Sequence, residues 1–302
     1  MGMSAVAASL SERRDRPTLG IATFIGNLLL MAFLSAMVKH MSTSFPLSEI
    51  LLFRFVFASL LFWVILFATG GLPVLRTTRP IDHAIRSLSG VVSLALMYFA
   101  LARIPIADAT ALSYAAPIFI TVLSIFVLKE TIGFRRWLAV IAGFIGVLLI
   151  AQPGGAGWSI GVAAAAGSAV TAAIVAIWLR RLSSSERSVT IGIYYNTTGV
   201  VLCLIWTLFS GAIMPQGMQW PLLLVFGLFC AGQQWLLTIS FRYAEASLLA
   251  PFEYLAMIFA AIVGFVFWGE IPVFTTWLGA LVIAASGLFI FQRKRQKKAA
   301  GQ

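Results

Sequence analysis

Ten apolar segments, separated by short polar stretches, account for most of the 302 residues of this chain. A helix needs about 20 apolar residues to cross the hydrocarbon core of a bilayer, and most of the segments approach or exceed that length. The runs are continuous rather than alternating, so a lipid-facing β-barrel is not indicated. The pattern predicts an all-α integral membrane protein with spans at 19–38, 48–69, 84–102, 109–128, 137–151, 160–179, 189–209, 220–240, 247–268 and 273–291.

The basic residues between these segments predict the orientation of the chain. If the N-terminus is cytosolic, every one of the 21 Lys and Arg residues except Lys39, Arg54 and Arg103 falls on the cytosolic side. Since cytosolic loops are enriched in Lys and Arg, both termini are predicted to be cytosolic. The same orientation gathers four tryptophans at the outer boundary, where they fit an interfacial belt: Trp158, Trp220, Trp268 and Trp277.

Composition supports the membrane interpretation and excludes other classes. The chain is 61% apolar and 10% charged, whereas soluble domains carry about 25% charged residues. The net charge of +11 would suggest nucleic acid in a soluble protein, but here the charges lie mostly between the spans, so we expect no nucleic-acid partner. The basic stretch 293–298 is expected to anchor the tail at anionic lipid. Cys203 and Cys230 lie inside apolar runs without metal-ligand spacing.

The chain also repeats itself. Shifting residues 114–150 by 140 positions gives nine identities, among them Tyr114/Tyr254 and Glu130/Glu270. Each unit contains five spans, and because five is odd, the second unit enters the membrane inverted relative to the first. Inverted repeats are typical of transporters that bind their substrate near the bilayer midplane. A duplicated structural bundle without transport is the alternative.

Three stretches of the first unit resemble a known family. "FRF" at 53–55, "YFALARIPIADATALSYAAPIFITVLSIFVLKETI" at 98–132 and "AGFIGVLLI" at 142–150 are similar to a half-unit of EamA-type transporters in the drug/metabolite transporter superfamily. The resemblance covers residues 19–291 and implies ten helices in two inverted halves within a bacterial-type inner membrane. Within the superfamily, the chain most resembles bacterial aromatic amino-acid exporters.

The repeat and the resemblance together predict four regions. These are a cytosolic leader at 1–18, a first five-helix repeat at 19–152, a second inverted repeat at 153–291 and a basic cytosolic tail at 292–302. We expect a monomer whose partners are the lipid bilayer and a small-molecule substrate.

Polar and aromatic residues inside the spans are the candidates for a substrate cavity. At 1.5 Å per residue, several of them lie at a common depth of about 10 Å from the cytosolic face. Lipid-facing polar groups at that depth are costly, so these side chains are expected to face a shared interior or to bind one another between helices. The candidates are Asn27, Arg54, Tyr98, Tyr114, Tyr195, Asn196, Gln233, Trp235, Glu253 and Tyr254.

Arg54 and Glu253 are the charged members of this set. Intramembrane charges usually find partners, so one interpretation is a direct or water-bridged pair. The other gives Glu253 a working role, either binding a substrate ammonium or carrying a coupling proton. The matched positions are Ser113 for Glu253 and Tyr195 for Arg54, so the repeated architecture does not itself require either charge.

Two further patterns concern helix packing and bending. Gly161, Ala165, Ala169 and Ala173 recur every four residues and predict a close-packing helix face. Pro117 and Pro251 each remove a helix hydrogen bond and are candidate hinges.

Taken together, these features predict a secondary transporter that exports small amphipathic metabolites, amino acids including aromatic ones among them. A multidrug or cationic-compound transporter of the same fold is the alternative, and a channel is a third. An enzyme is not expected, because His40 and His83 fall on opposite sides of the membrane and no paired metal-binding motif appears. No Walker-type motif is present, and no cofactor or metal is expected.

Overall fold

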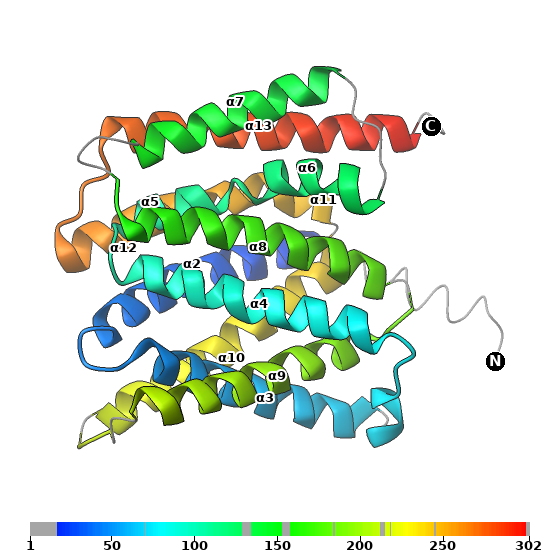
Figure 1. Ribbon diagram of the computed structural model, residues 1–302, viewed down its shortest axis with the longest axis vertical. Helices are drawn as coiled ribbons and strands as arrows, with labels where there is room; N and C mark the ends of the chain where they lie inside the picture. Colours follow the sequence, from blue (N-terminus) through cyan, green and yellow to red (C-terminus); the bar gives the residue numbers. More distant parts are fainter. Residues whose placement is uncertain are drawn as a thin grey trace.

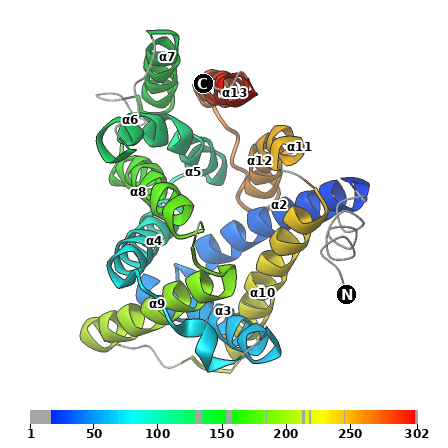
Figure 2. The same cartoon turned by 90° about the vertical axis from the view of Figure 1, so that its right-hand side faces the viewer.

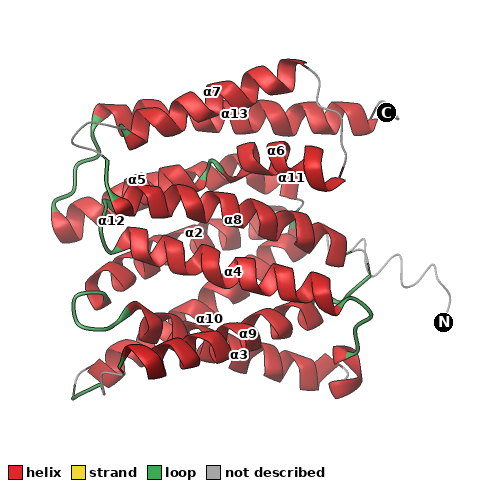
Figure 3. Cartoon of the chain, viewed as in Figure 1, coloured by secondary structure: helices red, strands yellow, loops and turns green. Residues whose placement is uncertain are grey.

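The computed structural model describes residues 17–69, 71–128, 134–152, 158–183, 185–211, 215–217, 219–244 and 246–299. Within these ranges every regular element is a helix, and no strand occurs (Figure 3). The elements are α2 (Pro17–Met41), α3 (Leu47–Thr69), η1 (Leu72–Leu75), α4 (Pro80–Leu101), α5 (Ile106–Ser113), α6 (Ala116–Leu128), α7 (Phe134–Ala151), α8 (Ile160–Leu182), α9 (Ser188–Ser210), α10 (Gln219–Tyr243), α11 (Ala246–Leu249), η2 (Ala250–Tyr254), α12 (Leu255–Trp268) and α13 (Phe274–Ala299).

The described helices form ten segments that each run from one end of a single bundle to the other. Seven stretches are long and apolar enough to span a bilayer, and three apolar helices are shorter: Trp137–Ala151, Phe252–Trp268 and Phe274–Phe289. The third helix begins at Pro80 rather than near 84, because a proline is well suited to the first turn of a helix. The last helix continues through the basic stretch to Ala299.

Both termini of the described chain lie at the same end of the bundle, which we call the termini end (Figure 1). The opposite end, where α2, α4 and α12 finish, we call the far end. Four exposed tryptophans, Trp158, Trp220, Trp268 and Trp277, lie at or beside the helix ends that meet at this far end, as an interfacial belt requires.

Helix packing follows the expected internal symmetry. α2 starts at the termini end, whereas its counterpart α8 starts at the far end (Figure 1). Helices α2, α3, α4 and α7 of the first unit correspond to α8, α9, α10 and α13 of the second. The packing of α4 on α8 therefore corresponds to that of α10 on α2, and the packing of α4 on α9 to that of α10 on α3 (Figures 1 and 2). Two helices pack on their own counterparts: α3 on α9, and α7 on α13. This is the arrangement that two five-helix units related by a two-fold axis in the membrane plane would produce.

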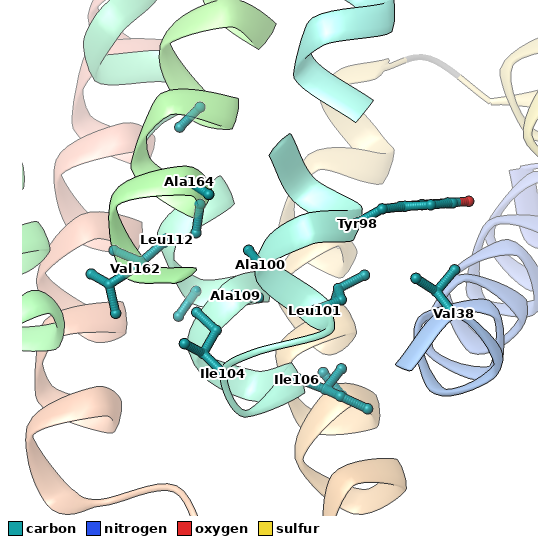
Figure 4. Packing of buried hydrophobic residues seen from close by; sticks show 14 of the residues in the cluster. Val38, Tyr98, Ala100, Leu101, Ile104, Ile106, Ala109, Leu112, Val162 and Ala164 are labelled. Carbon is teal, nitrogen blue, oxygen red and sulfur yellow. The ribbon is translucent and has the colours of Figure 1, made fainter. Parts of the chain in front are cut away.

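Small residues allow the close contacts between helices. Gly161, Ala165, Ala169 and Ala173 are all buried on α8, which confirms the predicted packing face. Near the far end, a well-packed apolar core joins α2, α4, α5 and α8 (Figure 4). Ile104, Ile106 and Leu112 of this core are at most 6% exposed.

Candidate substrate cavity

A cavity of about 310 Å³ lies between α3, α4, α8, α9 and α10. It extends from Arg54, well inside α3, to Ser183 and Ser188 at the termini ends of α8 and α9. Both serines are exposed, so the mouth of the cavity faces the termini end. The lining residues are Arg54, Ala58, Leu61, Phe62, Ile65, Arg86, Leu179, Ser183, Ser188, Val189, Ile191, Gly192, Tyr195, Asn196, Cys230, Gln234, Trp235 and Thr238.

Arg54 projects from α3 into this cavity and is held by a tyrosine. Its Nη1 donates a hydrogen bond of 2.9 Å to the hydroxyl of Tyr98, and its guanidinium carbon lies 5.7 Å from the centroid of that ring. A weaker contact of 3.8 Å joins the same nitrogen to Cys230 Sγ. Tyr98 itself is 5% exposed, so it acts behind the cavity wall, fixing the direction of Arg54.

Tyr195, Asn196 and Trp235 supply the aromatic and amide groups of the lining. Tyr195 meets the buried ring of Phe55 edge to face, with centroids 5.4 Å apart. Asn196 is buried and donates from Nδ2 to the carbonyl of Gly192 at 2.8 Å. Trp235 is 52% exposed. Four of the sequence candidates, these three and Arg54, are therefore brought together in one cavity.

Arg86 is a cavity residue that the sequence analysis did not select. It was counted as a cytosolic-side charge at the start of the span predicted at 84–102, but α4 begins at Pro80, so Arg86 lies deeper in the helix. Its guanidinium carbon lies 4.0 Å from the centroid of the Tyr195 ring. Its Nε and Nη1 atoms are buried and have no hydrogen-bond partner in the protein.

Asn27 and Gln233 form an interhelical contact outside this cavity. Gln233 Nε2 donates to Asn27 Oδ1 at 2.8 Å, joining α10 to α2, and Asn27 is 2% exposed. The adjacent residue Gln234 lines the cavity instead. The structure therefore gives these two amides the packing role that the sequence left open.

Tyr114, Glu253 and Tyr254 form a separate cluster where α5 and η2 meet. The two tyrosine rings, which are matched residues of the two repeats, lie 5.4 Å apart, edge to face. The Tyr114 hydroxyl donates to the Glu253 carbonyl oxygen at 2.9 Å. The Glu253 side chain is exposed. Arg54 makes its contacts with Tyr98 and Cys230 instead, so Arg54 and Glu253 do not form an ion pair.

Both candidate hinge regions are breaks in the helix. α5 ends at Ser113 and α6 starts at Ala116, just before Pro117. In the second unit, the 3₁₀ segment η2 contains Pro251 and separates α11 from α12. The breaks occur at matching places in the two units, although the two prolines do not align in sequence. Motion at these breaks remains a prediction.

A polar latch joins the two units at the far end, and we define it as Lys39, Glu270 and the backbone of Ile104 and Ile106. The Lys39 ammonium pairs with the Glu270 carboxylate and donates to the Ile104 carbonyl at 2.9 Å. Glu270 Oε2 accepts from the Ile106 amide, at the start of α5, at 3.1 Å. The latch therefore joins α2 and the α4–α5 turn of the first unit to the end of α12 in the second.

Local structure at the end of α12 places this carboxylate. Gly269 caps the helix in the left-handed region at φ 66°, where glycine is favoured because it has no Cβ. The chain reverses there, and the side chain of Glu270 lies against Gly264. Glu130, the residue matched to Glu270, lies outside the described residues.

Metal chemistry finds no support in this part of the chain. Among the described residues, no group of three or more His, Cys, Asp or Glu side chains is arranged to hold a metal ion. The two cysteines are buried and unpaired with each other.

A membrane-embedded helical bundle with an internal cavity open at one end is the architecture of a solute transporter. The EamA-like transporter family matches this sequence twice, at residues 18–152 and 159–292. The chain therefore belongs to the EamA-like transporter family.

Curated relatives carry several different substrate names. An S-adenosylmethionine uptake transporter of Rickettsia prowazekii is 26% identical over 92% of this chain and 94% of its own. A riboflavin transporter of Rhizobium johnstonii is 30% identical, covering 85% of both chains. A pseudopaline exporter of Pseudomonas aeruginosa is 28% identical over 87% of this chain and 92% of its own. These names indicate transporters of small molecules and not enzymes.

A solved crystal structure supports the fold. It is 21% identical, covers 91% of this chain and 96% of its own, and superposes with a TM-score of 0.58.

Proposed function

We propose that this protein is a secondary transporter that exports small amphipathic metabolites, amino acids including aromatic ones among them, by alternating access between two inverted repeats, 19–152 and 153–291. The observation that carries the proposal is the cavity of about 310 Å³, which is open at the termini end. Arg54, Tyr195, Asn196 and Trp235 are the side chains that we expect to contact the solute.

The proposed direction combines the cavity with the charge distribution. If both termini are cytosolic, as the basic residues predict, the cavity mouth faces the cytosol and is loaded from inside. The names of the relatives include both uptake and export, so they do not decide the direction. Amino acids fit the mixture of guanidinium, amide and aromatic groups in a cavity of this size.

The test is solute flux in proteoliposomes that contain the full chain. Vesicles are loaded with one labelled amino acid at a time, and efflux is followed with and without unlabelled solute outside. Saturable efflux that external solute accelerates supports alternating access. Absence of saturable flux for every amino acid and small aromatic tested would reject this substrate class, and flux that does not saturate would indicate a channel.

Transport of cationic compounds is the second candidate. The cavity lining disfavours it, because the lining contains two arginines and none of the acidic residues that the structure describes. Glu253 offers a carboxylate, but it lies in the cluster with Tyr114 rather than in the cavity. Flux of a small organic amine that is lost in Glu253→Gln would favour this alternative.

A further inference from the structure

The charge of the cavity lining carries a more specific inference, which rests on the proposed function. We infer that the cavity binds the carboxylate group of its solute between Arg54 and Arg86. Two guanidinium groups within one low-dielectric cavity make a site that is electrostatically complementary to a carboxylate.

Arg86 has unused hydrogen-bonding capacity. Tyr195 contacts the guanidinium by stacking and by a side-chain hydrogen bond, and neither contact engages Nε or Nη1. Nε and Nη1 are buried and have no protein acceptor, and leaving charged donors unpaired away from water is costly. A bound carboxylate would satisfy both, because its two oxygens match two adjacent N–H groups of a guanidinium.

Arg54 completes the site from the other helix. Only its Nη1 is engaged, by the neutral hydroxyl of Tyr98 and the Cys230 sulfur. Tyr195 lines the cavity together with both arginines. Arg54 is thus oriented by its neighbours, while its positive charge is not balanced by them.

Four of the six acidic residues described in the structure have side-chain partners outside the cavity. Asp82 lies 3.7 Å from Arg181, Asp108 accepts from Thr276, and Glu186 accepts from Thr77. Glu270 belongs to the latch at the far end. None of the acidic side chains within the described ranges lines the cavity, so the two cavity arginines keep their positive charge available for a solute.

The apolar part of the lining indicates what the solute carries besides its carboxylate. Leu61, Phe62, Ile65 and Trp235 present apolar surface around the arginines. An aromatic or aliphatic body can pack on these side chains, while the carboxylate meets the guanidinium groups. The volume of about 310 Å³ limits the solute to a small molecule.

Binding to the purified full chain in lipid nanodiscs tests the inference. The probes are phenylacetate, phenylacetamide and phenethylamine, which share one ring and differ in charge. We expect phenylacetate to bind at least 10-fold more tightly than the other two, since a charge-assisted hydrogen bond typically contributes a factor of about 10 to 100. Equal affinity of the acid and the amide, or no binding of any of the three, overturns the inference.

Variants identify the residues responsible. Arg86→Gln and Arg54→Gln should each weaken phenylacetate binding by about 10-fold or more, while Arg86→Lys should retain part of it. Arg103→Gln is the matched control, because Arg103 also stacks on an aromatic ring, at 3.5 Å from Phe99, but lies outside the cavity. If Arg54→Gln does not fold, Arg54→Lys replaces it and, like Arg86→Lys, should retain only part of the affinity. Unchanged affinity in both cavity variants overturns the assignment.

Two further measurements separate the alternatives. Inorganic phosphate is added as a competitor, and displacement of phenylacetate at equal concentration would assign the site to phosphoryl groups instead and so reject the carboxylate. Failure of this inference is distinguishable from failure of the proposed function. Saturable flux of solutes that carry no carboxylate would retain transport and reject the carboxylate site. Charge-selective binding without any flux would retain the carboxylate site and reject transport.

Discussion

Replacing Glu270 with glutamine should open the far end of the bundle. The substitution keeps the shape of the side chain and an oxygen that can accept from the Ile106 amide, but it removes the charge that pairs with Lys39. Lys39 keeps its hydrogen bond to the Ile104 carbonyl. The change therefore weakens the joint between α2 and α12 without removing bulk.

The magnitude follows from how buried the pair is. Breaking a fully buried ion pair costs about 3–5 kcal/mol, and an exposed pair contributes less than about 1 kcal/mol. The side chains of Lys39 and Glu270 are 14% and 17% exposed, so an intermediate value of about 2 kcal/mol is expected. If the latch exists only when the far end is closed, that energy shifts the balance toward the open form by roughly 30-fold.

Cysteine accessibility measures this shift. Ala107 is 2% exposed and follows the latch residue Ile106, so a cysteine placed there reports on far-end opening. The native cysteines, Cys203 and Cys230, are both buried and are first replaced. The labelling rate of the new thiol by a polar maleimide is then compared in nanodiscs with and without Glu270→Gln, and a rise of about one order of magnitude or more is expected.

A matched control and a double variant sharpen the interpretation. Thr275→Ala removes another far-end hydrogen bond, the 2.6 Å contact from Gln152, which joins α7 to α13 and does not touch the latch. It should leave labelling unchanged. Glu270→Gln should add little to Lys39→Met, because Lys39→Met already removes the ion pair. Equal labelling in Glu270→Gln and the parent protein would refute the idea that this pair holds the far end closed.

The remaining predictions concern the support of the cavity. Tyr98→Phe removes the acceptor that orients Arg54 and should weaken binding of an anionic solute a few-fold with little loss of folded protein, as measured by binding and by thermal unfolding in parallel; unchanged binding would show that this hydrogen bond does not position the guanidinium. Gly90→Ala would place a Cβ 2.7 Å from the Tyr195 ring and should lower the free energy of unfolding by about 1–3 kcal/mol while weakening solute binding. Gly232→Ala, whose Cβ would meet nothing closer than 3.8 Å, is the control and should lower neither.

Most of the architecture could be predicted, because few backbone conformations are stable inside a lipid bilayer. Every backbone polar group inside the membrane must be satisfied locally, so long apolar segments become helices, and their number and the repeat follow from the sequence. The packing face of α8 was predicted correctly, because small residues at a spacing of four lie on one side of a helix and let a neighbouring helix approach closely. The breaks near Pro117 and Pro251 likewise follow from the missing backbone donor.

The candidate site was predicted only in part, because depth along a helix does not give rotation about it. Successive residues differ by about 100° around the axis. Gln233 and Gln234 have nearly the same depth, yet Gln233 binds Asn27 and Gln234 lines the cavity. Arg86 was missed for a different reason: a basic residue near a helix start is ordinarily a topological signal, and only its packing on Tyr195 shows that it faces inward.

The contact between Tyr114 and Tyr254 has a consequence for how the protein can move. These are matched residues of the two repeats, and they touch each other, so their contact lies close to the axis that relates the halves. In a cycle in which each half adopts the conformation of the other, most contacts are exchanged for different ones, but a contact between matched residues is converted into itself. This ring pair would then act as a pivot. Its removal should destabilise both end states equally and leave the ratio between them unchanged.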